Sequence, residues 1–287
     1  MDGLTDKEFK SGVSRRGVVV GSLGVGFALS VQPVVAQNVI TTSTDGLEAG
    51  EVKIKTADVE IPGYRAMPKT GTNFPTVIVV QEIWGVHEYI KDVCRRFARA
   101  GYYAIAPELY ARQGDPQKAP DVPTIVRDIV SKVSDKQVMS DLDATVAFAK
   151  ASGKADTAKL GITGFCWGGR MVWLYAAHNP NVKAGVAWYG RMVGQASEMN
   201  PKHPIDLVQQ MNGAVLGLYG GADTGIPVET VQQMEKALTA ANKKHKFVVY
   251  PEAPHAFHAD YRPSFRKEAA EDGWKQALAW FKANGVG

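Results

Sequence analysis

The stretch Gly164-Phe165-Cys166-Trp167-Gly168-Gly169 decides how the rest of the sequence is interpreted. It follows a short apolar run at 160–163, predicted to be a strand, and it opens a predicted helix at 167–178. A glycine-x-nucleophile-x-glycine pattern in this position is typical of a sharp turn that exposes its central side chain. Here that side chain is a cysteine, and a helix N-terminus favours its thiolate form. The alternative is a structural cysteine in a glycine-rich turn.

Predicted strands and helices alternate on both sides of this turn. A hairpin is expected at 51–67, and the β-branched run at 76–80 is typical of a strand buried on both faces. Further strands are expected at 102–106, 182–188, 214–219 and 246–250, and helices at 88–100, 136–151, 227–241 and 264–284. This order predicts an α/β fold: a single domain with a mainly parallel sheet and helices on both faces. Functional residues are then expected at the carboxyl ends of the strands.

Composition narrows the class of protein. The 287 residues are 45% hydrophobic and 22% charged, which is ordinary for a globular protein and argues against disorder. The net charge is only +4 and no long basic run is present, so no nucleic-acid partner is expected. With two cysteines, a cysteine-rich zinc cluster is excluded. Cys94 lies on the apolar face of its predicted helix, which indicates a packed thiol.

Two more residues are candidates to act together with Cys166. Asp223 follows the strand predicted at 214–219, and His255 follows the one predicted at 246–250. The order nucleophile, acid, histidine is that of α/β-hydrolases, in which the acid orients the histidine and the histidine is the base. The segment around Asp223 alone is equally typical of a simple turn.

Gln81-Glu82-Ile83-Trp84-Gly85 ends the strand predicted at 76–80. Glu82 is a carboxylate in an apolar setting, so it is either a catalytic group or a turn residue. The N–H groups of Ile83 and Trp167 are predicted to form an oxyanion hole. The His255-x-x-His258 spacing has no third ligand, and neither a metal nor a cofactor is expected.

At this point the sequence resembles a family. Gln81–Val86, Leu109–Arg112, Gly164–Gly169, Gly221–Asp223 and His255–Phe257 look like the corresponding motifs of the dienelactone hydrolase (carboxymethylenebutenolidase) family. The resemblance runs from about residue 50 to the C-terminus. It implies an α/β-hydrolase fold without a large lid and a cofactor-free hydrolase of small lactones or esters.

The resemblance also implies roles for single residues. Cys166 would be the nucleophile, His255 the base and Asp223 the group that orients it. Glu82 would contact the resting thiol and help to activate it when substrate binds. The amides named above would then stabilise the oxyanion.

The substrate-binding residues follow the family's pattern less well. Family members hold the substrate carboxylate with arginines, one of them shortly after the histidine. Ala259 stands at about that place here, so Arg262 is predicted to take this role, or the substrate differs. Arg127 is a weaker candidate, and a solvated surface position is favoured for it. Tyr110 and Trp84 are predicted to border the pocket.

The N-terminal 36 residues have the organisation of an export signal. Ser14-Arg15-Arg16 precedes a weakly apolar run at 17–31, and small residues lead to an expected cut after Ala36. Paired arginines favour a twin-arginine signal, with an ordinary secretory signal or an uncleaved anchor as alternatives. The expected division of the chain is an export signal at 1–36, a linker at 37–49 and the catalytic domain at 50–287. This predicts a periplasmic or secreted protein whose partner is the export machinery, with no stable membrane association after cleavage.

Three functions remain open from the sequence. The favoured one is hydrolysis of a small-molecule lactone or ester through Cys166, His255 and Asp223, with an acyl-thioester intermediate. The second is a general exported carboxylesterase on the same fold. The third is a protein that uses the exposed thiol for redox chemistry or binding.

Overall fold

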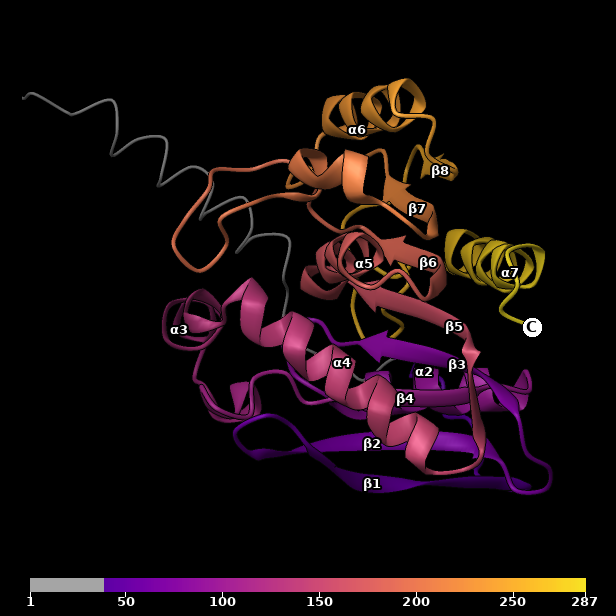
Figure 1. Ribbon diagram of the computed structural model, residues 1–287. Coiled ribbons are helices and arrows are strands. Elements are labelled where there is room, and N and C mark those ends of the chain that lie inside the picture. The colour runs from indigo at the N-terminus through magenta and orange to yellow at the C-terminus, as the bar shows by residue number, and fades with distance from the viewer. Residues whose placement is uncertain (1–38) are drawn as a thin grey trace, which may run out of the picture.

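Eight strands form one sheet in the computed structural model, which describes residues 39–287 (Figure 1). The strand order is β1-β2-β4-β3-β5-β6-β7-β8; β1, β2 and β4 pair antiparallel, and all other neighbours are parallel. The strands are β1 (Leu47–Lys55), β2 (Glu60–Pro68), β3 (Phe74–Val80), β4 (Tyr103–Pro107), β5 (Ala155–Phe165), β6 (Val182–Trp188), β7 (Ala214–Gly220) and β8 (His245–Tyr250). The prediction of a mainly parallel sheet is therefore confirmed.

Helices cover both faces of the sheet, as the sequence predicted. They are α2 (Glu88–Arg99), α3 (Val122–Asp128), α4 (Asp135–Ala151), α5 (Trp167–His178), α6 (Val228–Ala240) and α7 (Lys267–Ala283). Short 3-10 turns occur at Pro116–Lys118, Val130–Lys132 and Pro204–Gln210. Helices α4 and α5 lie in front of the sheet in Figure 1. Helices α2 and α7 share the other face, where the rings of Phe97 and Trp274 are 4.5 Å apart.

Strand β5 is longer than the apolar run from which it was predicted. β5 begins at Ala155, five residues before the run from which it was predicted. Its first residues, Ala155 and Asp156, pair with Phe74 and Pro75 of β3 through backbone groups, and a register shift follows. Hydrophobic periodicity reports buried side chains, so a partly exposed extension held by backbone hydrogen bonds escapes it.

The segment before β1 lies against the domain. Strand β1 begins at Leu47, so the last three residues of the predicted linker belong to the sheet. The N–H of Thr42 donates to the buried Asp92 carboxylate on α2 over 2.5 Å. The predicted export signal lies outside the described residues. Among residues 39–287, no helix is both long and apolar enough to cross a membrane.

The carboxyl edge of the sheet is held together by very close backbone packing. A Cβ atom added to Gly168 would lie 2.4 Å from the carbonyl oxygen of Gln81, just after β3. One added to Gly169 would lie 2.4 Å from the carbonyl oxygen of Trp188, at the end of β6. Only glycine lets the first turn of α5 come this close to both strands. The residue before this turn, Cys166, is thereby held at the edge where loops from several strands meet.

We predict that Gly169→Ala lowers the free energy of unfolding by more than about 2 kcal/mol, because the new methyl group meets backbone atoms that cannot move aside. Gly50→Ala is the matched control, since a Cβ there meets nothing within 4 Å. It should change stability by less than about 0.5 kcal/mol. Urea denaturation of both variants measures the difference, and equal stabilities would contradict the packing argument.

Candidate active site

Cys166 occupies the turn between β5 and α5 in a backbone conformation that side chains rarely adopt. Its φ is 57° and its ψ is −113°. Its N–H donates to the carbonyl oxygen of Trp188 over 3.0 Å, and its own carbonyl accepts from the N–H of Gly169. These bonds hold a conformation that costs about 1–3 kcal/mol by itself. The side chain is 6% exposed and lines a cavity.

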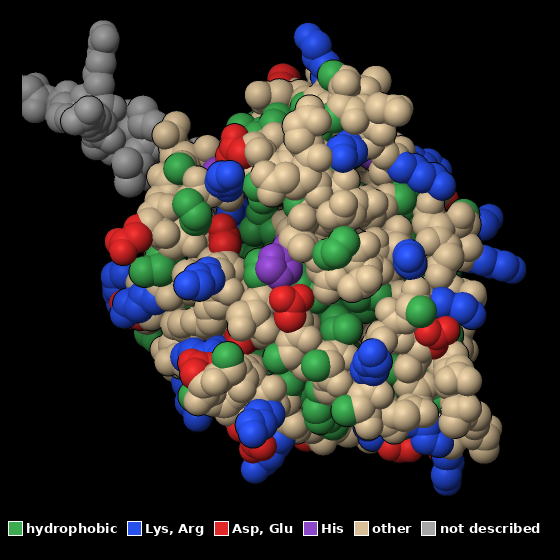
Figure 2. Space-filling view, viewed as in Figure 1, with side chains coloured by type: hydrophobic (Ala, Val, Ile, Leu, Met, Phe, Trp, Pro, Cys, Tyr) green, Lys and Arg blue, Asp and Glu red, His purple; other side chains and the backbone are tan. Residues whose placement is uncertain are grey.

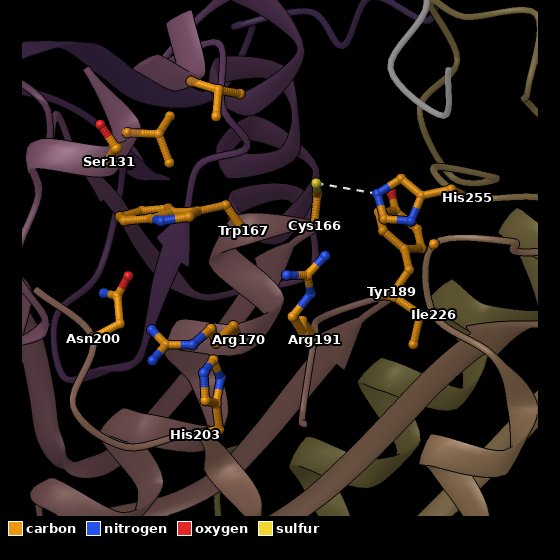
Figure 3. A pocket seen from close by; sticks show the side chains of 13 residues that line it. Ser131, Cys166, Trp167, Arg170, Tyr189, Arg191, Asn200, His203, Ile226 and His255 are labelled. Carbon is orange, nitrogen blue, oxygen red and sulfur yellow. Dashed lines mark hydrogen bonds between the residues drawn. The ribbon is translucent and has the colours of Figure 1, made fainter. Parts of the chain in front are cut away.

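His255 and Asp223 complete a hydrogen-bonded series with this thiol. The Nε2 atom of His255 lies 3.1 Å from the Sγ atom of Cys166 (Figure 3). On the other side of the ring, Nδ1 lies 2.6 Å from Oδ2 of Asp223. The second oxygen of Asp223 accepts the N–H groups of Gly225 and Ile226 over 2.8 and 3.1 Å. The carboxylate is therefore fixed by its own loop and directed at the histidine.

The loops that carry Asp223 and His255 are locked together. The N–H of Ala222 donates to the carbonyl oxygen of Ala253 over 3.1 Å. A Cβ atom on Gly220 would lie 2.2 Å from that same oxygen, so β7 must end in glycine for the two loops to meet. Both loops follow carboxyl ends of neighbouring parallel strands, as the sequence predicted for functional residues.

The charges around His255 favour its protonated form. Burial acts to lower the pKa of this imidazole, but the negative charge of Cys166 and the hydrogen bond to Asp223 outweigh burial and raise the pKa to about 10. A protonated imidazole next to Sγ stabilises a thiolate. The pair is thus arranged as a nucleophile beside a proton donor.

Glu82 is buried a short way from this pair, in a cluster of its own. Its Oε2 accepts a hydrogen bond from the hydroxyl of Tyr261 and lies 3.5 Å from Nε2 of His87. Burial acts to raise the pKa of Glu82, but the positive charge of Arg262 and the contacts to His87 and Tyr261 lower it from 4.5 to about 2. Within residues 39–287, Glu82 makes no hydrogen bond to the thiol of Cys166, which differs from the contact that the family resemblance implied.

The two predicted oxyanion-hole amides follow neighbouring strands. Trp167 is the first residue of α5, and Ile83 follows Glu82 in a turn closed by a bridge between Glu82 and Gly85. Neither N–H group donates to another group within the described part of the chain. Both donors are therefore free for a ligand oxygen.

The predicted substrate-binding residues lie beside Glu82 and the turn rather than along the cavity. The guanidinium of Arg262 lies over the rings of Trp84 and Tyr261, 5.5 and 5.1 Å from their centroids. The ring of Tyr110 is packed edge-on against Trp167, with centroids 4.9 Å apart. All three predicted residues, Arg262, Trp84 and Tyr110, are absent from the lining of the cavity described next.

A cavity of about 330 Å³ opens beside Cys166 and His255 (Figure 3). Apolar groups supply much of its wall, and two arginines, Arg170 and Arg191, also line it. On the face seen in Figure 2, hydrophobic side chains are visible in hollows of the surface, and Lys and Arg side chains are scattered over the face around them. The volume is in the range of small-molecule sites.

Sequence reasoning missed several residues of this region. Arg191 follows β6 by three residues, so the rule that placed Asp223 and His255 could have found it. Tyr189, two residues before Arg191, also lines the cavity, and the centroid of its ring lies 5.1 Å from that of His255. Tyr261 and His87 carried no signal, because their roles depend on where Glu82 lies.

The structure also shows the surroundings of three side chains for which the sequence predicted no catalytic role. Arg127 is exposed and paired with Asp128, as favoured from the sequence. Cys94 is buried in α2, where burial raises the pKa of its thiol. His258 is buried and bonded to the hydroxyl of Tyr89, and burial lowers its pKa to about 3. Within residues 39–287, no group of three or more His, Cys, Asp or Glu side chains is arranged to hold a metal ion.

Comparison with known proteins assigns the chain to a family. A profile of the "Dienelactone hydrolase family" matches residues 61–285, which contain every site residue described above. The chain belongs to the dienelactone hydrolase family. It is accordingly a hydrolase of the carboxylic ester class, on an α/β-hydrolase fold, as the sequence motifs indicated.

Close relatives cover nearly the whole chain. A protein of Methylorubrum extorquens named "Putative carboxymethylenebutenolidase" is 65% identical over 96% of this chain and 94% of its own length. A protein of the same name from Salmonella typhimurium is 52% identical over 91% of this chain and 96% of its own. The crystal structure of a "Putative Dienelactone Hydrolase" from Klebsiella pneumoniae is 55% identical, with a TM-score of 0.81, over 82% of this chain and 98% of its own.

The depressed pKa of Glu82 makes stability depend on pH. Because the folded pKa of about 2 lies below the ordinary 4.5, ionised Glu82 stabilises the fold above about pH 4.5, and this contribution is lost as the pH falls toward 2. The stability advantage of the wild type over Glu82→Gln should therefore shrink by about 1 kcal/mol between roughly pH 5 and pH 3.5. Urea denaturation at both pH values measures it. An advantage that stays constant would show that Glu82 is not held ionised.

Proposed function

We propose that this protein hydrolyses a small lactone or ester through a Cys166-His255-Asp223 triad. The observation that carries the proposal is the hydrogen-bonded series from Sγ to Nε2 and from Nδ1 to the Asp223 carboxylate. Membership of a carboxylic ester hydrolase family supports the reaction class. The carboxymethylenebutenolidase name of its relatives supports a lactone substrate.

The proposed reaction has two steps. In the first, the thiolate of Cys166 attacks the carbonyl carbon, and protonated His255 gives its proton to the departing alcohol or enol oxygen. An acyl-thioester on Cys166 results. In the second, neutral His255 takes a proton from water as the water attacks the thioester, and the carboxylic acid leaves. Asp223 holds the ring in the orientation that both transfers need.

Two further features of the proposal concern charge. The amides of Ile83 and Trp167 would bind the oxygen that becomes negative in each step, since they have no other acceptor within the described residues. In the resting site Oε2 of Glu82 accepts from the hydroxyl of Tyr261, while Oε1 has no hydrogen-bond partner among the described residues. Glu82 would assist the thiol by turning its carboxylate toward Sγ when substrate binds.

The volume of the cavity is also compatible with a second candidate function. About 330 Å³ bordered by Val126, Val130 and Ile226 accommodates simple acyl esters as well as a compact lactone. An assay of a dienelactone beside p-nitrophenyl acetate separates the two. Strong lactone turnover with little acetate turnover supports the lactonase, and acetate turnover alone supports a general carboxylesterase on the same triad. Absence of turnover of both would leave a non-hydrolytic use of the thiol.

We predict that Cys166→Ala lowers kcat by at least about 1,000-fold, because it removes the atom that bonds to the substrate. Cys94→Ala is the matched control: it removes the second thiol, which is buried in α2 away from the cavity. It should leave kcat within about twofold, although losing a packed sulfur costs some stability. Initial rates with either ester measure both variants. Full activity in Cys166→Ala would contradict the mechanism.

We also propose export of the folded protein through the paired arginines of its N-terminal segment. Lys substitutions at Arg15 and Arg16 together should trap the full-length chain in the cytoplasm if the twin-arginine route is used. Cell fractionation and the mass of the mature chain measure the outcome. Unchanged export would favour an ordinary secretory signal, and an uncut chain in the membrane fraction would favour an anchor.

A further inference from the structure

The two arginines of the catalytic cavity differ in what surrounds them. Arg170 makes a two-pronged ion pair with Asp135, at 2.5 and 2.8 Å, and donates to the carbonyl oxygen of Lys202. Arg191 makes neither a hydrogen bond nor an ion pair within residues 39–287, although it is partly buried in the same wall. One positive charge of the cavity is therefore neutralised, and the other is not.

The backbone that carries Arg191 is held firmly. The N–H of Tyr189 donates to the carbonyl oxygen of Leu218 over 2.8 Å, and the carbonyl of Gly190 accepts from the hydroxyl of Tyr219 over 2.9 Å. A Cβ atom on Gly190 would lie 2.2 Å from the backbone of Gly169, so this segment is pressed against the turn of the nucleophile. Arg191 thus projects from a fixed point next to the site.

Figure 3 shows where the two side chains extend. Arg191 reaches toward the pair formed by Cys166 and His255, whereas Arg170 lies beside His203 at the other end of the cavity. A guanidinium presents paired N–H donors that match a carboxylate. In a partly desolvated wall without a counter-charge, such a group favours an anion on the ligand.

Arg262, which the sequence favoured for binding a substrate carboxylate, lies in different surroundings. It is 5% exposed, and its charge acts on the buried carboxylate of Glu82. A substrate carboxylate at Arg262, whose guanidinium makes neither a hydrogen bond nor an ion pair among residues 39–287, would lie against the rings of Trp84 and Tyr261. It would also lie outside the cavity that Cys166 and His255 share.

We infer that Arg191 is a specificity-determining residue that binds an anionic group of the substrate, a carboxylate borne on the acyl part of the ester. This inference adds a substrate-binding residue to the proposed function. It rests on that function only in assuming that the protein hydrolyses an ester. The carboxylate lies in the cavity while the carbonyl faces Sγ. Arg262 is instead a positioning residue that acts through Glu82.

The first test uses two esters that differ in charge. Mono-p-nitrophenyl glutarate carries a carboxylate where p-nitrophenyl hexanoate carries an ethyl group. Arg191→Gln should lower kcat/KM for the glutarate by about tenfold or more and leave that for the hexanoate within about twofold, since a charge-assisted pair contributes on this order. Arg127→Gln, at an exposed arginine paired with Asp128, is the matched control and should change neither. Arg262→Gln should lower both together.

The second test does not depend on ester hydrolysis. Iodoacetate and iodoacetamide both alkylate thiols and differ mainly in charge. The alkylation ratio is the rate at Cys166 with iodoacetate divided by the rate with iodoacetamide, and it is normalised to the same ratio for free N-acetylcysteine. A high ratio reports that an anion is bound beside the thiol. Peptide mass spectrometry identifies the modified cysteine. The ratio should fall about tenfold in Arg191→Gln and stay unchanged in Arg127→Gln.

The outcomes of the two tests are separable. A wild type that cleaves neither ester would overturn the proposed function, and the alkylation ratio would still decide the role of Arg191. An alkylation ratio that is the same in wild type and Arg191→Gln would overturn the inference. So would a loss of glutarate preference in Arg262→Gln but not in Arg191→Gln, because the anion would then lie at Arg262.

Discussion

The contact between the first turn of α5 and the carboxyl ends of β3 and β6 is the constraint on which the site depends. Gly168 and Gly169 lie so close to the backbone of those strands that a single methyl group would not fit. This packing holds Cys166 at a positive φ and directs its thiol into the cavity. It also brings the helix N-terminus and the free N–H of Trp167 to the sulfur. Without it, the histidine would have no fixed partner.

Charge in the buried site is divided between two clusters. Cys166, His255 and Asp223 form one, in which the imidazole of His255 lies between the thiol and the Asp223 carboxylate. Glu82 and Arg262 anchor the other, in which the carboxylate stays ionised in spite of burial. Each cluster balances most of its own charge, which is what allows so many ionisable groups to be buried. Arg191 belongs to neither, and that is why its charge is available to a ligand.

Much of this arrangement could be predicted from the sequence because it follows from strand ends. Helix α5 and strand β6 were predicted with their observed bounds, and Cys166, Asp223 and His255 were placed at one edge by the order of the elements. Side-chain partners could not be predicted in the same way. That Glu82 bonds to Tyr261 rather than to the thiol depends on a loop about 180 residues away. The places of Arg262 and Arg191 relative to the cavity likewise depend on how the loops pack, and sequence spacing does not report this.

The proposed mechanism requires Cys166 to carry the acyl group during turnover. Rapid acid quenching of the enzyme with an excess of p-nitrophenyl acetate, followed by peptide mass spectrometry, tests it most directly. We expect an acetyl adduct on the peptide that contains Cys166, formed as fast as the first burst of nitrophenol, held at a steady level while ester remains, and lost once the ester is consumed. Steady turnover with that peptide unmodified, or with the adduct on another residue, would contradict it.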